Sequence, residues 1–233
     1  MNTDSENSLK NKKCIYDITK FTHLDYPSQL ACIVWFNGCN MRCDFCYNKD
    51  IVFAKEGSYT FEDVLSFLQT RVSLLDAVVL SGGEASFYDL TDFCRQIKKL
   101  GFLIKLDTNG TNPLHVKKLI DLELLDYVAL DYKAPQSKFT QITHSNKYNE
   151  FSKTLDMLIT GNIAFEVRTT LHVDLLNCND INSIMSDLKH RGYDNTYYIQ
   201  EFLDTKSTIG NLQKSSLSFD KSKLSNNLHV EWR

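Results

Sequence analysis

The sequence has little of what would set it apart from ordinary globular proteins. Its 233 residues include nine glycines and three prolines, too few for a low-complexity or linker-rich chain. No apolar run approaches the length of a transmembrane helix, and the polar residues 1–13 do not resemble a signal peptide. We therefore expect a cytoplasmic protein with no membrane partner.

An excess of charge of one sign is also missing, because 26 Lys and Arg residues are balanced by 29 Asp and Glu residues. The formal net charge of −3 gives no electrostatic reason to expect binding to nucleic acid. A chain of this length, with 42% hydrophobic residues, can bury one sizeable core. These bounds predict a single globular domain without a nucleic-acid partner.

The cysteines are odd in number, seven in all. Because the cytosol keeps thiols reduced, this count favours a metal site over a framework of disulfides. Three of them, Cys39, Cys43 and Cys46, fall within eight positions of the stretch NGCNMRCDFCYN, residues 37–48. Their spacing, C-x3-C-x2-C, is the feature of the chain that points most directly to chemistry.

Strand-like and helix-like segments alternate along the chain. The expected strands are residues 30–36, 75–81, 102–108, 126–133, 164–173 and 196–203. The expected helices are residues 60–72, 88–101, 112–123, 148–160 and 180–192. This alternation predicts a parallel sheet with right-handed crossovers, either open and doubly wound or curved into a partial barrel. A short strand near 15–18 is also expected, whereas the Ser- and Lys-rich residues after Asp204 follow no pattern.

The cysteine spacing helps to distinguish a structural zinc site from an iron–sulfur cluster. Structural zinc favours a C-x2-C pair followed by a second pair of Cys or His ligands, and no second pair follows here. The other candidates are scattered along the chain: Cys14, Cys32, Cys94, Cys178 and His23. A [4Fe–4S] cluster held by three thiolates keeps one iron free of protein ligands, open to the amino and carboxylate groups of an amino acid. The sequence therefore favours the cluster and retains zinc as an alternative.

The cysteine loop resembles the C-x3-C-x-aromatic-C motif of the radical S-adenosylmethionine (radical SAM) superfamily, with Phe45 at the aromatic position. The resemblance implies an α/β fold, a partial (β/α)6 TIM-like barrel of the radical SAM type. It also implies two cofactors, a [4Fe–4S] cluster and S-adenosyl-L-methionine, and a flavodoxin- or ferredoxin-type electron donor. In that family the cluster passes one electron to the sulfonium, which yields methionine and a 5′-deoxyadenosyl radical.

Polar residues that suit a charged cofactor follow the next two strands. Ser81-Gly82-Gly83-Glu84 follows the second strand, where glycines permit close approach to a ligand and Glu84 can accept a hydrogen bond from an ammonium group. This stretch resembles the GGE segment of the family, which binds the methionine amino group, although Ala85 stands where the family often has proline. Asp107-Thr108-Asn109-Gly110 ends the third strand.

The stretches KLDTNG and DYVALDYKAP resemble segments of glycyl-radical-enzyme activating proteins. The resemblance implies that Asp107 and Lys133 contact the methionine portion and Asp131 the ribose. It also suggests that Asp107, Thr108 and Asp131 hold a monovalent cation. Arg168, which is alternatively a structural ion-pair residue, lies at the matching end of the fifth strand. The candidate cofactor contacts are Gly82, Gly83, Glu84, Asp107, Asn109, Asp131, Lys133, Thr170, His172 and Gln200, and the candidate cluster ligands are Cys39, Cys43 and Cys46.

Within the superfamily the similarity over residues 20–203 is greatest to anaerobic ribonucleoside-triphosphate reductase activating proteins. The stretch THLDYPSQLACIVWFNGCNMRCDFCYN resembles their segment in which Asp-Tyr-Pro-Gly precedes the cluster strand, with Ser28 in place of the glycine. This implies a glycyl radical enzyme as partner, namely an anaerobic ribonucleotide reductase. We divide the chain into a partly disordered lead (1–19), a radical SAM core domain (20–203) and a C-terminal tail (204–233).

Three alternatives stay open. The first is the same chemistry on pyruvate formate-lyase or another glycyl radical enzyme. The second is a radical SAM reaction on a small molecule, as in 7-carboxy-7-deazaguanine synthase. The third is a zinc-binding interaction module without catalysis.

Overall fold

The structure is a computed structural model that describes residues 12–205, 207–215 and 217–233. The disorder expected for the first residues therefore falls largely outside the described residues. The chain forms two compact units. Unit 1 comprises Met1–Asn40, Asp50–Thr108 and Leu114–Val128, and unit 2 comprises Met41–Lys49, Asn109–Pro113 and Ala129–Arg233. The division into lead, core domain and tail stays a prediction.

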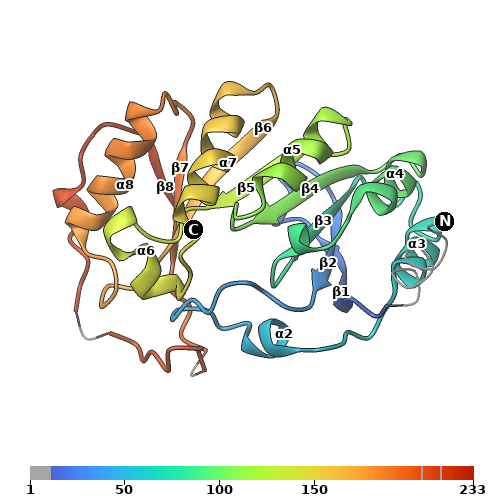
Figure 1. Ribbon diagram of the computed structural model, residues 1–233, viewed down its shortest axis with the longest axis horizontal. Coiled ribbons are helices and arrows are strands. Elements are labelled where there is room, and N and C mark those ends of the chain that lie inside the picture. The colour runs from blue at the N-terminus through green and yellow to red at the C-terminus, as the bar shows by residue number, and fades with distance from the viewer. Residues whose placement is uncertain (1–11, 206, 216) are drawn as a thin grey trace. The chain divides into compact units, whose positions relative to one another are not determined.

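All six expected strands and all five expected helices are present, with ends that differ by a few residues (Figure 1). The strands are β1 Ile15–Thr22, β2 Ala31–Phe36, β3 Ala77–Gly82, β4 Leu103–Thr108, β5 Tyr127–Asp131, β6 Ala164–Leu171, β7 Tyr197–Glu201 and β8 Val230–Trp232. The helices are α2 Lys49–Phe53, α3 Phe61–Gln69, α4 Thr91–Lys99, α5 Pro113–Asp121, α6 Gln136–Thr143, α7 Tyr148–Thr160 and α8 Cys178–His190, with short 3₁₀ turns η1 Ala85–Phe87 and η2 Lys221–Lys223. Among the described residues, no helix is long and apolar enough to cross a membrane.

Unit 1 is built on strands β1 to β4, which lie side by side in chain order. β1 runs antiparallel to β2, whereas β2, β3 and β4 are parallel. Phe36 pairs with Gly82, and Leu80 with Leu106, so the carboxyl ends of the three parallel strands meet at one edge. Residues that follow these strands are thereby placed next to one another.

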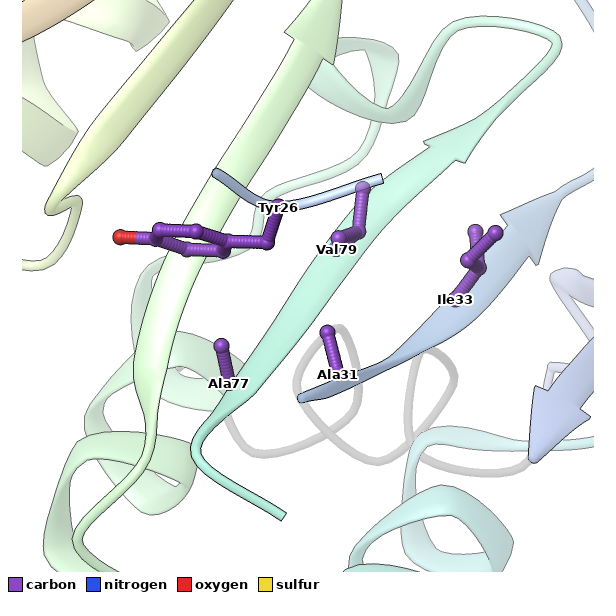
Figure 2. Close-up of a cluster of buried hydrophobic side chains, with 5 residues drawn as sticks. All are labelled: Tyr26, Ala31, Ile33, Ala77 and Val79. Carbon is purple, nitrogen blue, oxygen red and sulfur yellow. The ribbon is translucent and has the colours of Figure 1, made fainter. Parts of the chain in front are cut away.

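The two faces of this sheet differ in character. One face holds a hydrophobic cluster of Tyr26, Ala31, Ile33, Ala77 and Val79. Figure 2 shows Ala31 and Ile33 along β2, Ala77 and Val79 along β3, and the ring of Tyr26 to one side of them. The opposite face carries Phe36 against the rings of Phe61 on α3 and Phe93 on α4, which stack with their centroids 4.4 Å apart. Helices α3 and α4 therefore cover this second face.

Helix α3 begins where the sequence indicates. The Thr60 side chain accepts a hydrogen bond from the Asp63 amide at 3.2 Å, and the Asp63 carboxylate accepts one from the Thr60 amide at 2.8 Å. This reciprocal pair is a capping box, which satisfies backbone donors that a helix N-terminus otherwise leaves open.

In unit 2, strands β6, β7 and β8 are parallel and adjacent. Strand β8 lies in the tail, where no element was expected, and its three residues are too few to show a periodic pattern. Helices α2 and α6 were likewise not expected. The short strand near 15–18 is confirmed, but it is longer, because β1 extends to Thr22 along the edge of β2.

Candidate active site

In unit 1, the loop after β3 is hydrogen-bonded to the backbone that leads into Cys39. The amide of Gly83 donates to the Phe36 carbonyl at 2.8 Å, and the amide of Glu84 donates to the Gly38 carbonyl at 2.9 Å. Gly82 has φ +114, and a Cβ on Gly83 would lie 1.8 Å from the Gly38 oxygen. Both glycines are thus required by contact between two loops, a reason that the sequence did not reveal.

The carboxylate of Glu84 is 2% exposed and is fixed within unit 1. Its Oε1 accepts hydrogen bonds from Thr108 Oγ1 at 2.7 Å and from Ser86 Oγ at 2.6 Å. Thr108 ends β4 and is itself buried. The predicted residues Gly82, Gly83, Glu84 and Thr108 are therefore brought together by two neighbouring strand ends.

Asp107 forms an ion pair with Lys105, a residue that the sequence analysis did not single out. Its Oδ1 lies 3.0 Å from Nζ of Lys105, and its Oδ2 accepts a hydrogen bond from Ser81 Oγ at 3.0 Å. The Lys105 side chain is 3% exposed and also donates to the Asp25 carbonyl at 2.6 Å. The signal was present, since Lys105 interrupts the apolar residues Leu103, Ile104 and Leu106 of β4. Lys105 thus joins Asp107 to the Asp-Tyr-Pro segment, whose Tyr26 is buried in the core.

The cysteine loop passes from unit 1 into unit 2 after Asn40, so that Cys43 and Cys46 belong to unit 2. Cys43 is buried, and burial raises the pKa of the Cys46 thiol, against the lowering effects of the Asn48 amide and the Lys133 charge. Phe45 is buried too, and Nζ of Lys133 lies 5.7 Å from its ring centroid. The predicted cofactor residue Lys133 therefore lies beside two of the predicted cluster ligands.

A charged triad after β5 forms the centre of the unit 2 site. Asp131 Oδ1 lies 2.5 Å from Arg168 Nε, and its Oδ2 lies 2.9 Å from Lys133 Nζ. Burial alone would raise the pKa of Asp131, but Arg168 and then Lys133 outweigh it and hold the pKa well below its usual range. Burial would lower the pKa of Lys133, but the charges of Asp131 and Cys43 raise it above its usual range. Asp131 and Lys133 therefore stay ionised at neutral pH. Arg168 forms an ion pair with Asp131, in line with the structural alternative considered for it.

The remaining predicted contacts differ in how they are held. Oδ1 of Asn109 accepts from the Thr111 amide at 3.0 Å, as in an Asx turn, which is a structural role for this residue. Thr170 pairs in register with Gln200 on the adjacent strand β7. His172 is 2% exposed, and its Nε2 lies 2.9 Å from the Gln213 carbonyl of the tail. His172 is therefore buried against the tail and does not lie on an exposed rim.

Three of the other cysteines, Cys14, Cys32 and Cys94, are buried, whereas Cys178 is half-buried. Burial raises the pKa of Cys14 to about 11 and the pKa values of Cys32 and Cys94 to about 12, so these thiols stay protonated at neutral pH. Among residues 12–205, 207–215 and 217–233, no three His, Cys, Asp or Glu side chains converge as a ready metal centre. The three-cysteine ligand set is therefore a proposal, based on its donor chemistry and spacing.

A family model described as the Radical SAM superfamily matches residues 33–175, more than half of the chain. The chain belongs to the radical SAM superfamily. Its cofactors are therefore those of the superfamily, a [4Fe–4S] cluster and S-adenosylmethionine. The chain is also similar to a protein of Methanocaldococcus jannaschii named as a glycyl-radical enzyme activating enzyme, with 29% identity over 198 residues, 82% of this chain and 80% of the relative.

Two further likenesses each cover about half of the other protein. Pyruvate formate-lyase 1-activating enzyme of Escherichia coli is 36% identical over 118 residues, which cover 47% of this chain and 48% of that enzyme. The crystal structure of Streptococcus suis SuiB bound to S-adenosylmethionine matches 86% of this chain and 51% of its own, with a TM-score of 0.62 and 13% identity. This chain thus spans about half of that structure, which shows the fold alone. With the family match, it confirms the predicted partial TIM-like barrel and excludes the doubly wound alternative.

The residues present in this radical SAM protein suit both cofactors. Thiolates on a short loop are the usual ligands of iron–sulfur clusters. In unit 2 the charge of Lys133 opposes the burial that raises the pKa of the Cys46 thiol. Glu84 and Asp107 in unit 1 offer carboxylates to an ammonium group. Lys133 in unit 2 offers a cation to a carboxylate.

Proposed function

We propose that this protein is a glycyl-radical-enzyme activase whose partner is an anaerobic ribonucleotide reductase. The observation that carries the proposal is the position of Lys133, with its paired Asp131 and Arg168, beside the loop of Cys43 and Cys46. Activation of a glycyl radical enzyme is supported by the similarity to the Methanocaldococcus protein, which extends over most of both chains. The choice of reductase rests on sequence resemblance, in the stretch around Asp25-Tyr26-Pro27 and in the stretches LLDAVVLSGGEAS and LGFLIKLDTNG.

Each residue has a defined task in this proposal. Cys39, Cys43 and Cys46 hold the cluster, Lys133 binds the methionine carboxylate, and Glu84 and Asp107 receive the methionine amino group. When bound, the cluster and S-adenosylmethionine would use one electron from the donor to supply methionine and a 5′-deoxyadenosyl radical, the group able to take the α-hydrogen of a glycine in the partner. The buried surroundings of Cys43 and Phe45 keep water away from this chemistry. The flavodoxin- or ferredoxin-type donor and the cytoplasmic location stay predictions.

The cluster is tested first, on protein reconstituted without oxygen. Replacing Cys39, Cys43 or Cys46 by Ala should abolish the intact cubane in each case. The matched controls Cys94→Ala and Cys178→Ala should retain four irons and four sulfides per chain, as expected for one cubane. Stoichiometric zinc without sulfide would support the zinc-module alternative.

The cofactor contact is tested by titration with S-adenosylmethionine. Loss of a charged hydrogen bond costs about 1.5–3 kcal/mol, which corresponds to roughly tenfold to a hundredfold in affinity. Lys133→Ala should weaken binding by this amount with the cluster still present. The exposed Lys117, which pairs with Asp121 on α5, provides the control Lys117→Ala with unchanged affinity. Equal affinities of both variants for S-adenosylmethionine would show that Lys133 does not bind this cofactor.

The partner is tested by electron paramagnetic resonance. Reduced protein, S-adenosylmethionine and an anaerobic ribonucleotide reductase of the same organism should give a glycyl doublet, with 5′-deoxyadenosine formed in proportion to spin. A doublet that appears only with pyruvate formate-lyase would support the activase function and show that the ribonucleotide reductase is not the partner. Turnover with a small pterin-like substrate, and with no protein partner, would instead favour the 7-carboxy-7-deazaguanine synthase type of reaction.

A further inference from the structure

The backbone of the cysteine loop in unit 2 is held from two sides. The amides of Arg42 and Asp44 donate to the carbonyls of Thr143 and Ile142 at 2.9 and 3.0 Å. These carbonyls belong to the last turn of α6, where a helix leaves its acceptors unused. The carboxyl-terminal turn of α6 thus fixes one edge of the loop.

The other edge is held by the C-terminal tail. The amide of Ile209 donates to the Cys46 carbonyl, and the amide of Gly210 donates to the Asp44 carbonyl, both at 2.9 Å. One of these acceptors belongs to a predicted cluster ligand, and the other immediately follows Cys43. A segment remote in the sequence is therefore joined to the loop by backbone hydrogen bonds.

The tail segment is folded as a defined turn. Thr208 is 2% exposed, and its hydroxyl accepts from the Leu212 amide at 2.8 Å. The Asn211 amide donates to the Thr208 carbonyl at 3.1 Å, and Asn211 has φ +53, a conformation that asparagine tolerates well. The turn Thr208–Leu212 is thus stabilised by its own hydrogen bonds and presents two donors to the loop.

Gly210 is the point of closest approach. A Cβ at this position would lie 2.6 Å from Cβ and 2.8 Å from Cα of Asp44. No positive φ is involved, so only the space beside Asp44 requires glycine. The Asp44 carboxylate is also held on its other side, because its Oδ1 lies 2.7 Å from Nε2 of His144, the residue that ends α6.

We propose that the turn Thr208–Leu212 is a positioning element that holds Cys43 and Cys46 in the geometry for the cluster. The inference rests on the proposed cluster function and gives the tail a role within it. The loop lies outside strands and helices from Arg42 to Cys46, so its shape depends on α6 and on this turn. Displacing the turn should loosen the loop and accelerate loss of iron.

The test uses Gly210→Ala in the full chain, with Gly101→Ala as the matched control. Gly101 has φ +92, and a Cβ at this position would meet no atom within 4 Å, so its substitution strains the backbone in unit 1 without touching the loop. On reconstituted protein, we expect iron release to a chelator to be roughly tenfold faster for Gly210→Ala, the equivalent of about one hydrogen bond. Gly101→Ala should release iron as the unmodified protein does. The electron paramagnetic resonance signal of the reduced cluster should change in Gly210→Ala only.

A second measurement needs neither cluster nor partner. In the apo chain, hydrogen exchange at residues 207–212 should be slow and should become roughly tenfold faster in Gly210→Ala. Should Gly210→Ala fail to fold, Ile209→Pro removes the donor to Cys46 without adding bulk beside Asp44. Equal iron release and exchange in Gly210→Ala and the unmodified chain would overturn the inference. A chain that binds no cluster, but shows the expected exchange, would overturn the proposed function and retain the positioning contact.

Discussion

Replacing Asp131 by Asn should destabilise the protein strongly, because it removes the anion that lies between two cations. Asp131 lies 2.5 Å from Arg168 Nε and 2.9 Å from Lys133 Nζ, and each of the three side chains is less than 20% exposed. Removing one partner of a buried ion pair costs about 3–5 kcal/mol, since the other charge is left uncompensated. Because Asn can still accept a hydrogen bond, we expect the lower end of this range, about 3 kcal/mol.

Asp121→Asn is the matched control. Asp121 pairs with Lys117 at 2.6 Å, a similar distance, but both side chains are 57% exposed. An exposed pair of this kind contributes about 0.3–0.5 kcal/mol. The assay is urea denaturation of the apo chain at pH 7 with thiols reduced. Equal losses of unfolding free energy in Asp131→Asn and Asp121→Asn would refute the argument that burial makes the triad strong.

The same variant gives a pH dependence of known sign. The pKa of Asp131 is depressed in the folded protein, so its charge contributes stability that is fully present above the ordinary Asp pKa of about 3.9. As pH falls through the folded pKa, that contribution is lost. The difference in unfolding free energy between the unmodified chain and Asp131→Asn should therefore be constant from pH 7 to about 5 and shrink below about pH 4. A difference that grows on acidification would contradict the assigned ionisation.

Three further predictions concern unit 1. Ser28 has φ +61, a conformation unfavourable for a side chain with Cβ, so Ser28→Gly should raise the unfolding free energy by about 0.5–1 kcal/mol in urea denaturation; a loss of stability would show that the strain is compensated. Thr60→Ala removes half of the α3 capping box and should lower the unfolding free energy by about 1 kcal/mol. The control Thr205→Ala, in the exposed tail, should leave the unfolding free energy unchanged. Lys105→Met removes the buried cation beside Asp107 and should lower the unfolding free energy by about 3 kcal/mol in urea denaturation. An unchanged urea midpoint would mean that Lys105 does not contribute to stability.

The sequence by itself determined the order of elements and the kind of chemistry. Apolar runs such as residues 30–36 fixed the buried strands, because a strand covered on both faces must be apolar throughout. Thr60 and Asp63 fixed a helix start through their own local hydrogen bonds. The spacing of Cys39, Cys43 and Cys46 indicated the metal chemistry, since ligands on one short loop need no information from the rest of the chain.

Only the tertiary structure decided which groups restrain these residues. Lys105 and Asp25 are 80 positions apart, and the tail turn at Gly210 is still more remote from Asp44, so no local pattern could join them. Strand β8 shows the same limit, because three residues gain strand structure only by pairing with β7. The periodicity of apolar residues in the sequence indicates whether a residue is buried. The residues that it contacts depend on how the strands are brought together. Asp131 illustrates the difference: its position after a strand was readable, and its depressed pKa came only from Arg168 and Lys133 folded around it.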